Sequence, residues 1–289
     1  MKIIILTKHP TLEYETARLV TKFIEGNHSV QVCQFSEFAV VINDTLKYHG
    51  EDIDMPDVVL VRYGAGITSA ELSVIRYFEL RGIRCVNTST SVDIVQNKFY
   101  ASQLLNNANI AVPATMLVKF PVDINLIKTH IGFPCIIKVI TGSFGEGVYM
   151  VHTDIEYLKF VEFLKNIDND KLLLAQEYLG DNPGVDLRVF VIGDKVIGAM
   201  KRVAPKDDFR ANITIGGTGE SYPVTNEITE IALSTASALG LEIAGIDLLF
   251  DHRGFRVCEA NSNPGFKGFD QYCKVDIAEH IFQYITHLK

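Results

Sequence analysis

A chain of 289 residues is long enough for about two domains, and a hydrophobic content of 47% is ordinary for a globular protein with a sizeable core. The formal net charge of -8 at pH 7 argues against general binding to nucleic acid or to an anionic membrane, so we expect neither partner. The longest apolar runs, such as residues 3–6, are too short to span a bilayer, and the first residues lack a signal-peptide core.

The cysteines and histidines indicate neither a disulfide framework nor a zinc site. The five cysteines are scattered, no Cys-x-x-Cys occurs, and most lie in apolar, strand-like surroundings. The eight histidines form no metal-spaced pair. We therefore expect a reducing, cytoplasmic setting.

Residues 1–90 alternate between predicted strands and helices. We expect strands at residues 3–6, 28–35, 57–62 and 84–87, and helices at residues 12–25 and 69–81. Thr11 is the expected cap of the first helix, and residues 40–48 read as a small hairpin that turns at Asn43 and Asp44. This alternation predicts a small α/β domain with a parallel sheet. No glycine fingerprint follows the first strand, which argues against a nicotinamide dehydrogenase.

A second unit is predicted at residues 96–178. Its expected helices cover residues 97–107, 122–131 and 154–166, and its expected strands cover residues 115–118, 135–140, 148–152 and 172–176. A glycine-rich loop, residues 141–147, separates the second strand from the third. The order of elements predicts an α+β subdomain of ordinary size.

A third unit is predicted at residues 179–289. Strands at residues 186–192 and 195–200 should pair across Gly193 and Asp194 as a hairpin. A polar, basic stretch follows at residues 201–219, then a helix at 225–239, a second hairpin at 245–260 and a closing amphipathic helix at 275–288. The fold class is therefore α/β with α+β subdomains.

The second hairpin carries residues that indicate a metal site. Asp247 lies within an otherwise apolar strand, while Glu259 and Asn261 end the return strand. Because strand side chains alternate, Glu259 and Asn261 share a face that Asp247 can meet from the neighbouring strand. Two carboxylates and an amide oxygen suit Mg²⁺. A solvated hairpin end is the alternative, although an unpaired buried acid such as Asp247 is costly.

Other polar residues are ambiguous when each is taken alone. The glycine-rich loop is neither a Walker A loop nor a Rossmann turn, and it fits a flexible hairpin as well as a phosphate cradle. Lys138 precedes it inside an apolar strand, where a lysine either reaches solvent from an edge or pairs with an anion such as phosphate. Asp186 and Arg188 share one strand face. A basic group also follows the first hairpin, for which a solvated loop is the alternative: Arg202, Lys206 and Arg210.

The order of these motifs resembles that of the ATP-grasp carboxylate–amine ligases, and most closely their RimK-like branch. The run is Lys98, Lys138, the glycine-rich loop, Gln176-Glu177-Tyr178, Asp186-x-Arg188, Asp207-Asp208-Phe209-Arg210-Ala211-Asn212, Gly245-x-Asp247 and Glu259-x-Asn261. The most specific pieces are Asp-Phe-Arg-Ala-Asn, Ala-Gly-Ile-Asp, Glu-Ala-Asn-Ser-Asn-Pro-Gly and Val-Asp-Ile-Ala. The resemblance covers residues 96–287, and it implies an ATP-grasp fold preceded by the small α/β domain.

The resemblance implies a nucleotide site with these residues. The ATP phosphates would be bound by Lys98 and Lys138, under a lid loop that includes Gly142, Ser143, Gly145 and Gly147. The adenine hinge would hold Glu177 and Tyr178, with Asp186 toward the ribose or adenine. The catalytic group at the γ-phosphate and reacting carboxylate would be Arg188, Arg210 and Asn212. Two Mg²⁺ ions, which Mn²⁺ can replace, would be held by Asp247, Glu259 and Asn261.

The family reaction phosphorylates a carboxylate and then lets an amine attack the acylphosphate, which yields an amide, ADP and phosphate. The resemblance implies an amino acid such as glutamate as one substrate, a small-molecule or peptide carboxylate as acceptor, and a homo-oligomer, either dimer or tetramer. One departure concerns the acceptor site. Branch members that act on glutamate tails often carry a second arginine where this chain has Val203.

Two other functions remain open at this stage. An ATP-grasp kinase would release a phosphorylated product without forming an amide, and a regulatory module would bind ATP without turnover, since a fold does not fix an activity. The complete set of Asp247, Glu259 and Asn261 argues against a dead site.

Overall fold

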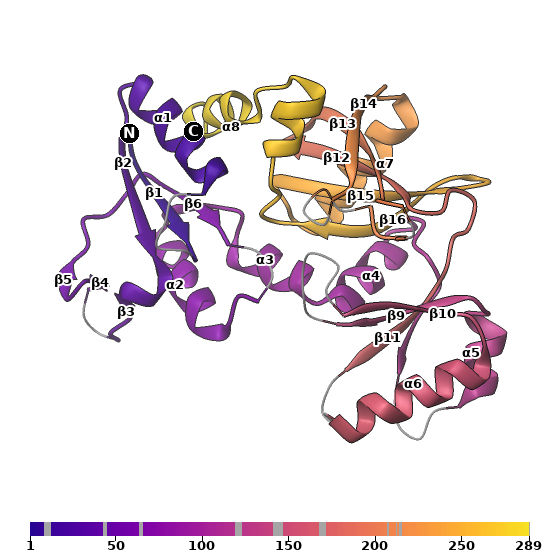
Figure 1. The fold of residues 1–289 in the computed structure, drawn as a ribbon. Helices are drawn as coiled ribbons and strands as arrows, with labels where there is room; N and C mark the ends of the chain where they lie inside the picture. The colour runs from indigo at the N-terminus through magenta and orange to yellow at the C-terminus, as the bar shows by residue number, and fades with distance from the viewer. Residues whose placement is uncertain are drawn as a thin grey trace.

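The computed structural model describes residues 1–8, 13–42, 45–63, 66–118, 123–140, 147–167, 172–206, 208–211, 213 and 216–288. Within these residues the strands form four sheets. Figure 1 shows three larger bodies, one around each of the three larger sheets, with both chain ends beside the first sheet. None of the helices in the described part of the chain is long and apolar enough to cross a membrane.

The first sheet is parallel, as the alternation of elements predicts. Its strand order is β2-β1-β6-β7, from β1 (Lys2–Thr7), β2 (Ser29–Gln34), β6 (Val58–Arg62) and β7 (Arg84–Val86). The helices of this region are α1 (Tyr14–Glu25) and α2 (Ser69–Glu79). A capping box starts α2. The Thr68 side chain accepts from a backbone N–H of the first turn, and the Glu71 carboxylate accepts from the backbone N–H of Thr68. The predicted Thr11 cap of α1 lies outside the described residues.

The small hairpin expected at residues 40–48 is different in the structure. The strand that pairs with β4 (Lys47–Tyr48) is β3 (Phe38–Ala39), and β5 (Glu51–Asp52) adds a third strand. The expected strand 28–35 also ends at Gln34, because residues 35–37 form a 3-10 turn. The apolar residues 40–42 do not form a strand, and Ile42 is 87% exposed. The turn at Asn43 and Asp44 lies outside the described residues.

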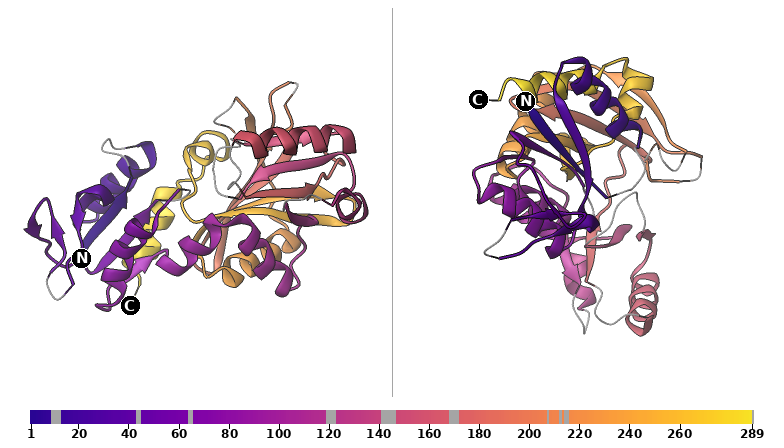
Figure 2. Two further views of the ribbon diagram at one scale, coloured as in Figure 1. Left: turned by 90° about the horizontal axis from the view of Figure 1, so that it is seen from below. Right: turned by 90° about the vertical axis from the view of Figure 1, so that its left-hand side faces the viewer.

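The second sheet is antiparallel and has helices on one face. Its order is β10-β9-β11-β8, from β8 (Thr115–Val118), β9 (Cys135–Val139), β10 (Val148–Val151) and β11 (Leu173–Glu177). The covering helices are α5 (Ile124–His130) and α6 (Asp154–Ile167), whose Ile127 and Tyr157 pack against Ile137. Because neighbouring residues of a strand point to opposite faces, Lys138 points away from these helices. Figure 2 places α6 and the first sheet at opposite ends of the molecule.

The third sheet has five antiparallel strands in the order β14-β13-β12-β15-β16. They are β12 (Val185–Ile192), β13 (Lys195–Val203), β14 (Thr218–Tyr222), β15 (Ile243–Asp251) and β16 (Gly254–Asn261). Both predicted hairpins are confirmed, whereas β14 falls partly in the stretch that was expected to be only polar and basic. One face packs against α4 (Lys98–Asn107) and α7 (Asn226–Ala238) through residues such as Val189 and Ala232.

Two further helices complete the chain. The sequence predicts no helix at α3 (Ser89–Gln96), which leads from the first sheet to α4. The closing helix α8 (Ile277–Thr286) is confirmed and follows a π-helical segment, Phe269–Cys273. It returns to the first domain and lies against α1, so Ile3 and Phe23 share one apolar cluster with Phe190 and Ile281. The first sheet and the third sheet thus bury part of their apolar surface together.

Asn87 joins the end of β7 to the third sheet. Its side chain is buried, and its Nδ2 donates to the carbonyl oxygens of Ile243 and Ser262, each at 2.8 Å. Its Oδ1 accepts from the backbone N–H groups of Glu242 at 2.7 Å and Ile243 at 3.0 Å. One amide therefore satisfies four backbone groups at this junction.

We predict that Asn87→Ala lowers the free energy of unfolding by about 2–4 kcal/mol, because buried backbone groups left without a partner cost about 1–3 kcal/mol each. Urea unfolding measures the change. Asn107→Ala, at an exposed position on α4, is the matched control and should change stability by less than about 0.5 kcal/mol. Equal losses in the two variants would contradict the junction role.

Candidate functional site

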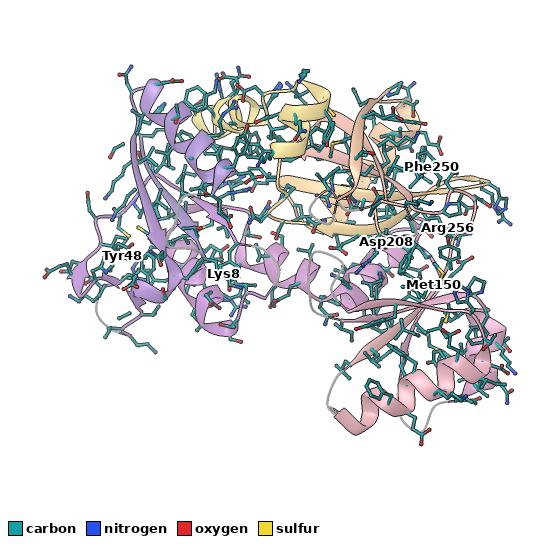
Figure 3. The ribbon with its side chains drawn as sticks, in the orientation of Figure 1. Lys8, Tyr48, Met150, Asp208, Phe250 and Arg256 are labelled. Carbon is teal, nitrogen blue, oxygen red and sulfur yellow. The ribbon has the colours of Figure 1, made fainter. Side chains whose placement is uncertain are left out.

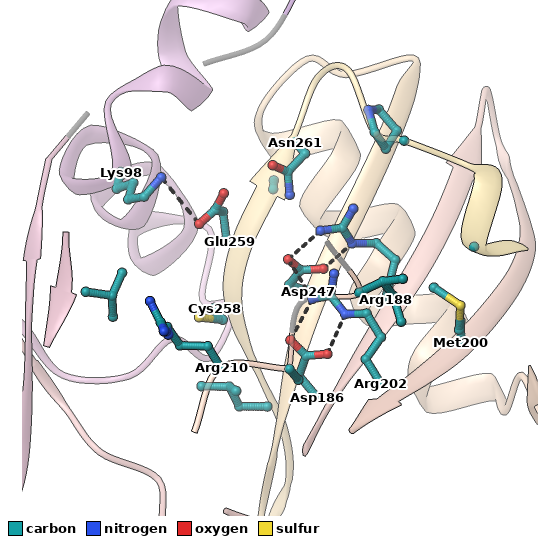
Figure 4. Close-up of a pocket in the computed structure, with 18 of the residues that line it drawn as sticks. Lys98, Asp186, Arg188, Met200, Arg202, Arg210, Asp247, Cys258, Glu259 and Asn261 are labelled. Carbon is teal, nitrogen blue, oxygen red and sulfur yellow. Dashed lines mark hydrogen bonds and ion pairs between the residues drawn. The ribbon is translucent and has the colours of Figure 1, made fainter. Parts of the chain in front are cut away.

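A cavity of about 750 Å³ lies where the three larger sheets meet. The second sheet contributes Lys138 and Gln176, the third sheet contributes its charged face, and the first sheet contributes Arg62 from the end of β6. Figure 3 shows the side chains over the whole molecule, and Figure 4 shows the charged part of this cavity. Most of the site residues named from the sequence line it.

Four charged side chains form a network on the third sheet, in which Arg202 and Asp247 are buried and Asp186 and Arg188 are half-buried (Figure 4). Arg202 holds Asp186 with two hydrogen bonds, from Nε at 2.7 Å and from Nη2 at 2.6 Å. Arg188 holds Asp247 in the same forked manner, with Nη2 at 2.7 Å from Oδ2 and Nε also in contact. Arg202 Nη2 lies 3.1 Å from Asp247 Oδ2 and so links the two pairs. Bidentate arginine–carboxylate pairs of this kind are among the stronger hydrogen-bonded contacts in proteins.

Strand register explains why these four residues meet. Asp186 and Arg188 are two apart on β12 and share a face, as the sequence predicts. Asp186 lies opposite Arg202 of β13, and Arg188 lies opposite Asp247 of β15. The sequence-based view of Arg202 as part of a basic loop is thus incomplete, because the residue belongs to β13 and is buried.

The network sets the charge of its two acids in opposite ways. Burial alone would raise the pKa of Asp247, but Arg188 and Arg202 outweigh it and hold that pKa below its usual value. For Asp186 burial prevails, so its pKa is raised despite Arg202. Asp247 is therefore the acid that stays ionised most firmly, although it is buried.

The expected metal ligands line the same cavity, and each has a protein partner. Glu259 lies opposite Asp247 in the sheet register, but its carboxylate is turned to Lys98, with Nζ 3.3 Å from Oε2. Asn261 donates from Nδ2 to the carbonyl oxygen of Gly245 at 3.4 Å, so its Oδ1 takes no part in this bond. The donor set of two carboxylates and one amide oxygen fits a hard divalent cation.

Lys138 pairs with a neutral group, which the sequence did not suggest. Its buried ammonium donates to Gln176 Oε1 at 2.8 Å, and Gln176 Nε2 donates to Thr115 Oγ1 at 2.8 Å. An ammonium has three donors, and an amide oxygen does not neutralise its charge. Lys138 therefore presents a positive charge to the cavity at the end where Val148 and Tyr178 also line it.

Glu177 and Arg210 are held by neighbours. Glu177 Oε2 accepts from Arg256 Nη1 at 2.7 Å and from the backbone N–H of Ala114 at 3.1 Å, so this side chain fixes the hinge between the second and third sheets. Arg210 Nη2 lies 2.8 Å from Asp208 Oδ2, and hydrogen bonding to Arg210 lowers the pKa of Asp208 to about 2. Arg210 also lines the cavity.

Of the expected lid residues, one lies within the described part of the chain. Gly147 is described and has a left-handed φ of 70°, which suits glycine at the start of β10. The rest of the expected lid and one catalytic residue lie outside the described residues: Gly142, Ser143, Gly145 and Asn212.

Comparison with known families identifies the protein. A family model described as the RimK-like ATP-grasp domain matches residues 95–285, and one described as the RimK PreATP-grasp domain matches residues 1–92. The chain belongs to the RimK-like ATP-grasp family. It is therefore an ATP-dependent ligase of the class that forms amide bonds. The family resemblance seen in the sequence is confirmed.

Relatives span the whole RimK-like chain. The probable alpha-L-glutamate ligase 1 of Shewanella sp. (strain MR-4) is 35% identical over 292 residues, which cover 100% of this chain and 96% of the relative. The RimK domain ATP-grasp protein from Sphaerobacter thermophilus has a TM-score of 0.77 at 18% identity, covering 98% of this chain and 99% of that one. The ATP-grasp ligase PsnB, in complex with a phosphomimetic variant of its minimal precursor, Mg and ADP, has a TM-score of 0.76 at 20% identity, covering 98% and 97%. These two structures confirm the expected fold.

We predict that Arg202→Met lowers the free energy of unfolding by about 3–5 kcal/mol, because it leaves Asp186 buried without its cation. The loss should shrink as the pH falls, since a protonated Asp186 needs no cation. Lys201→Met is the matched control, because Lys201 pairs with the exposed Glu220 and should contribute only about 0–1 kcal/mol. Urea unfolding at two pH values measures both effects, and a pH-independent loss equal to that of the control would refute the network's role.

Proposed function

We propose that this RimK-like ligase joins an amino acid such as glutamate to the carboxylate of an acceptor through an acylphosphate. The observation that carries the proposal is the cavity in which Lys138 of the second sheet faces the charged third sheet. Transfer of a phosphoryl group to a carboxylate brings negative charges together, and such a site supplies cations on both sides of them. The name of the relative, a probable alpha-L-glutamate ligase, supports glutamate as the amino acid.

The proposed nucleotide site lies between the second and third sheets. Lys98 and Lys138 would bind the ATP phosphates, and Glu177, Tyr178 and Asp186 would lie toward the adenosine. The lid residues Gly142, Ser143, Gly145 and Gly147 would cover the phosphates. PsnB, a neighbour in fold, was solved with Mg and ADP, which supports ATP and Mg²⁺ as the requirements of this chain.

Asp247, Glu259 and Asn261 would hold the metal, as two Mg²⁺ ions or two Mn²⁺ ions. Such ions would shield the charge on the transferring phosphoryl group. Before any metal binds, the two acids are neutralised by ion pairs: Lys98 pairs with Glu259, and Arg188 pairs with Asp247. A cation held by Glu259 would free Lys98 to bind phosphate, so both acids would stay compensated.

Two arginines and one asparagine would act on the reacting groups. Arg188, Arg210 and Asn212 would hold the reacting carboxylate and the γ-phosphate. In the first step the bond from the γ-phosphorus to the ADP oxygen breaks and a bond to a carboxylate oxygen forms. In the second step the amine nitrogen bonds to the carbonyl carbon, the carbon–oxygen bond to phosphate breaks, and the amine releases a proton. Carboxylate alone is a poor electrophile, and phosphorylation supplies the leaving group.

Three features of the chain stay predictions: the domain borders at residues 1–90, 96–178 and 179–289, the cytoplasmic location and a homo-oligomeric state.

Val203, which lies at the end of β13 beside the cavity residue Arg202, would help to shape the acceptor site. A kinase and a non-catalytic ATP-binding module are the competing functions, and the fate of a labelled carboxylate oxygen separates them.

We predict that Glu259→Gln lowers kcat at least about a hundredfold while ATP binding persists, because shielding by a bound cation contributes several kcal/mol to phosphoryl transfer. ADP release at saturating Mg²⁺ measures the rate, and thermal unfolding should be little changed because the Glu259 side chain is 29% exposed. Glu220→Gln, at an exposed position of β14, is the control. Near-normal ADP release by Glu259→Gln would show that the metal assignment is wrong.

The order of the chemistry predicts the fate of one oxygen atom. When the acid substrate carries heavy oxygen in its carboxylate, one labelled oxygen should appear in the released phosphate for each amide formed. Mass spectrometry of phosphate and amide measures this. AMP as a product would contradict the mechanism, a stable phosphorylated product would favour the kinase, and ATP binding without turnover on any acid–amine pair would favour the regulatory module.

A further inference from the structure

Residues of the first domain line one side of the cavity, which we call the first-domain wall. This wall contains a buried arginine, Arg62, that has no role in the proposed chemistry. Arg62 is the last residue of β6, a central strand of the parallel sheet, and it is 8% exposed. In open parallel sheets, ligands bind in the crevice beyond the carboxyl ends of the strands. Arg62 stands at that end and lines the cavity.

The guanidinium of Arg62 is poorly satisfied. Its Nε is buried and has no hydrogen-bond partner among the described residues. Its Nη1 lies 3.5 Å from the carbonyl oxygen of Pro264, at the outer limit of a hydrogen bond, and its Cζ lies 5.8 Å from the centre of the Phe266 ring. No carboxylate forms an ion pair with it among the described residues, in contrast to Arg188 and Arg202.

The cost of this arrangement points to a missing anion. Burial lowers the pKa of Arg62 to about 10, and Glu15 and Glu13 only partly offset that effect, so the side chain remains a cation at neutral pH. A buried cation without a paired anion is strongly unfavourable unless a ligand completes it. The unbonded Nε belongs to the edge by which a guanidinium takes a carboxylate, as Arg202 takes Asp186.

The neighbouring groups carry the opposite sign or accept hydrogen bonds. Glu13 and Glu15 line the same part of the cavity, and Glu15 is fixed there because its Oε1 accepts from the backbone N–H groups of Phe266 at 3.1 Å and Lys267 at 3.2 Å. Asn263 Oδ1 is a second buried polar atom without a partner in the described part of the chain. A cation beside acids and an orphan acceptor suits a zwitterion, which carries a carboxylate and an ammonium on one carbon.

We propose that Arg62 binds the α-carboxylate of the amino-acid substrate. The amino group of this substrate binds beside Glu13, Glu15 and Asn263. The inference rests on the proposed ligase function. The reacting carboxylate of the acid substrate needs the cations of the second and third sheets, while the α-carboxylate of the amine substrate keeps its charge throughout and needs a permanent counter-charge. The first domain would thereby select the amino acid, and the other two sheets would activate the acid.

Calorimetry with the full chain and a non-hydrolysable ATP analogue tests the site without an identified acceptor. L-glutamate and its α-carboxamide are the probes. We expect the wild-type protein to bind the carboxamide at least about tenfold more weakly, since hydrogen bonds to charged groups contribute about 1.5–3 kcal/mol. Arg62→Gln should weaken L-glutamate binding by a similar factor, lose the preference over the carboxamide, and leave the affinity for the ATP analogue unchanged.

Two further variants sharpen the result. Arg62→Lys keeps the charge without the fork and should recover only part of the glutamate affinity. Arg76→Gln removes an exposed arginine of the same domain outside the cavity and should behave as wild type. If Arg62→Gln does not fold, the Arg62→Lys variant and the wild-type comparison of the two probes still decide the matter.

Failure of this site and failure of the ligase function have different signatures. Wild-type binding of both probes with equal affinity, no binding of L-glutamate, or glutamate binding that is unchanged in Arg62→Gln would each overturn the Arg62 assignment, even if the protein forms amides. Arg62-dependent glutamate binding in a protein that forms no amide would support the site and contradict the ligase.

Discussion

The pairing of two acids with two arginines on one face of the third sheet is the constraint on which the site depends. Ions taken out of water are costly, and Asp186, Arg188, Arg202 and Asp247 repay that cost only when every hydrogen bond between them is made. Three strands, β12, β13 and β15, must therefore lie in one fixed register, and the separate pairing of β15 with β16 places Glu259 opposite Asp247. The charges of the proposed site are thus balanced by its own side chains in the structure.

The sequence predicted the elements of this site better than their register. Alternation along β12 and β16 correctly placed Asp186 with Arg188 and Glu259 with Asn261. Counting back from the two hairpin turns, however, puts Lys201 opposite Asp186 and Cys258 opposite Asp247. Irregularities at Phe190/Val191 and at Asp247/Leu248 shift both pairings by one residue, which brings Arg202 and Glu259 into place. A bulge adds one residue to one strand and turns every later side chain to the other face. The first bulge, at Ile197, has Gly198 beside it, whereas the second, at Cys258, has no neighbouring glycine or proline.

Contacts between distant parts of the chain account for most of the other differences. The fold class and the family followed from alternating elements and from the motif order, because both are local in the sequence. The partners of Lys98 and Glu177 are 161 and 79 residues away, at Glu259 and Arg256, and no local pattern indicates them. The sequence does not single out Arg62 or Asn87 for the same reason: Arg62 ends and Asn87 follows an ordinary buried strand, and only the packing of the first sheet on the third gives them a role.

The place of the last helix has a consequence for how the chain folds as it is made. The faces of α1 and β1 that bear Leu19, Phe23 and Ile3 are buried in one cluster with Ile281 and Ile285 of α8. A domain that begins to fold on the ribosome therefore keeps an apolar surface uncovered until α8 emerges. The residues of β1 and α1 are synthesised before those of α8, so the first sheet, which carries Arg62 at the cavity, completes its core only when α8 has been made.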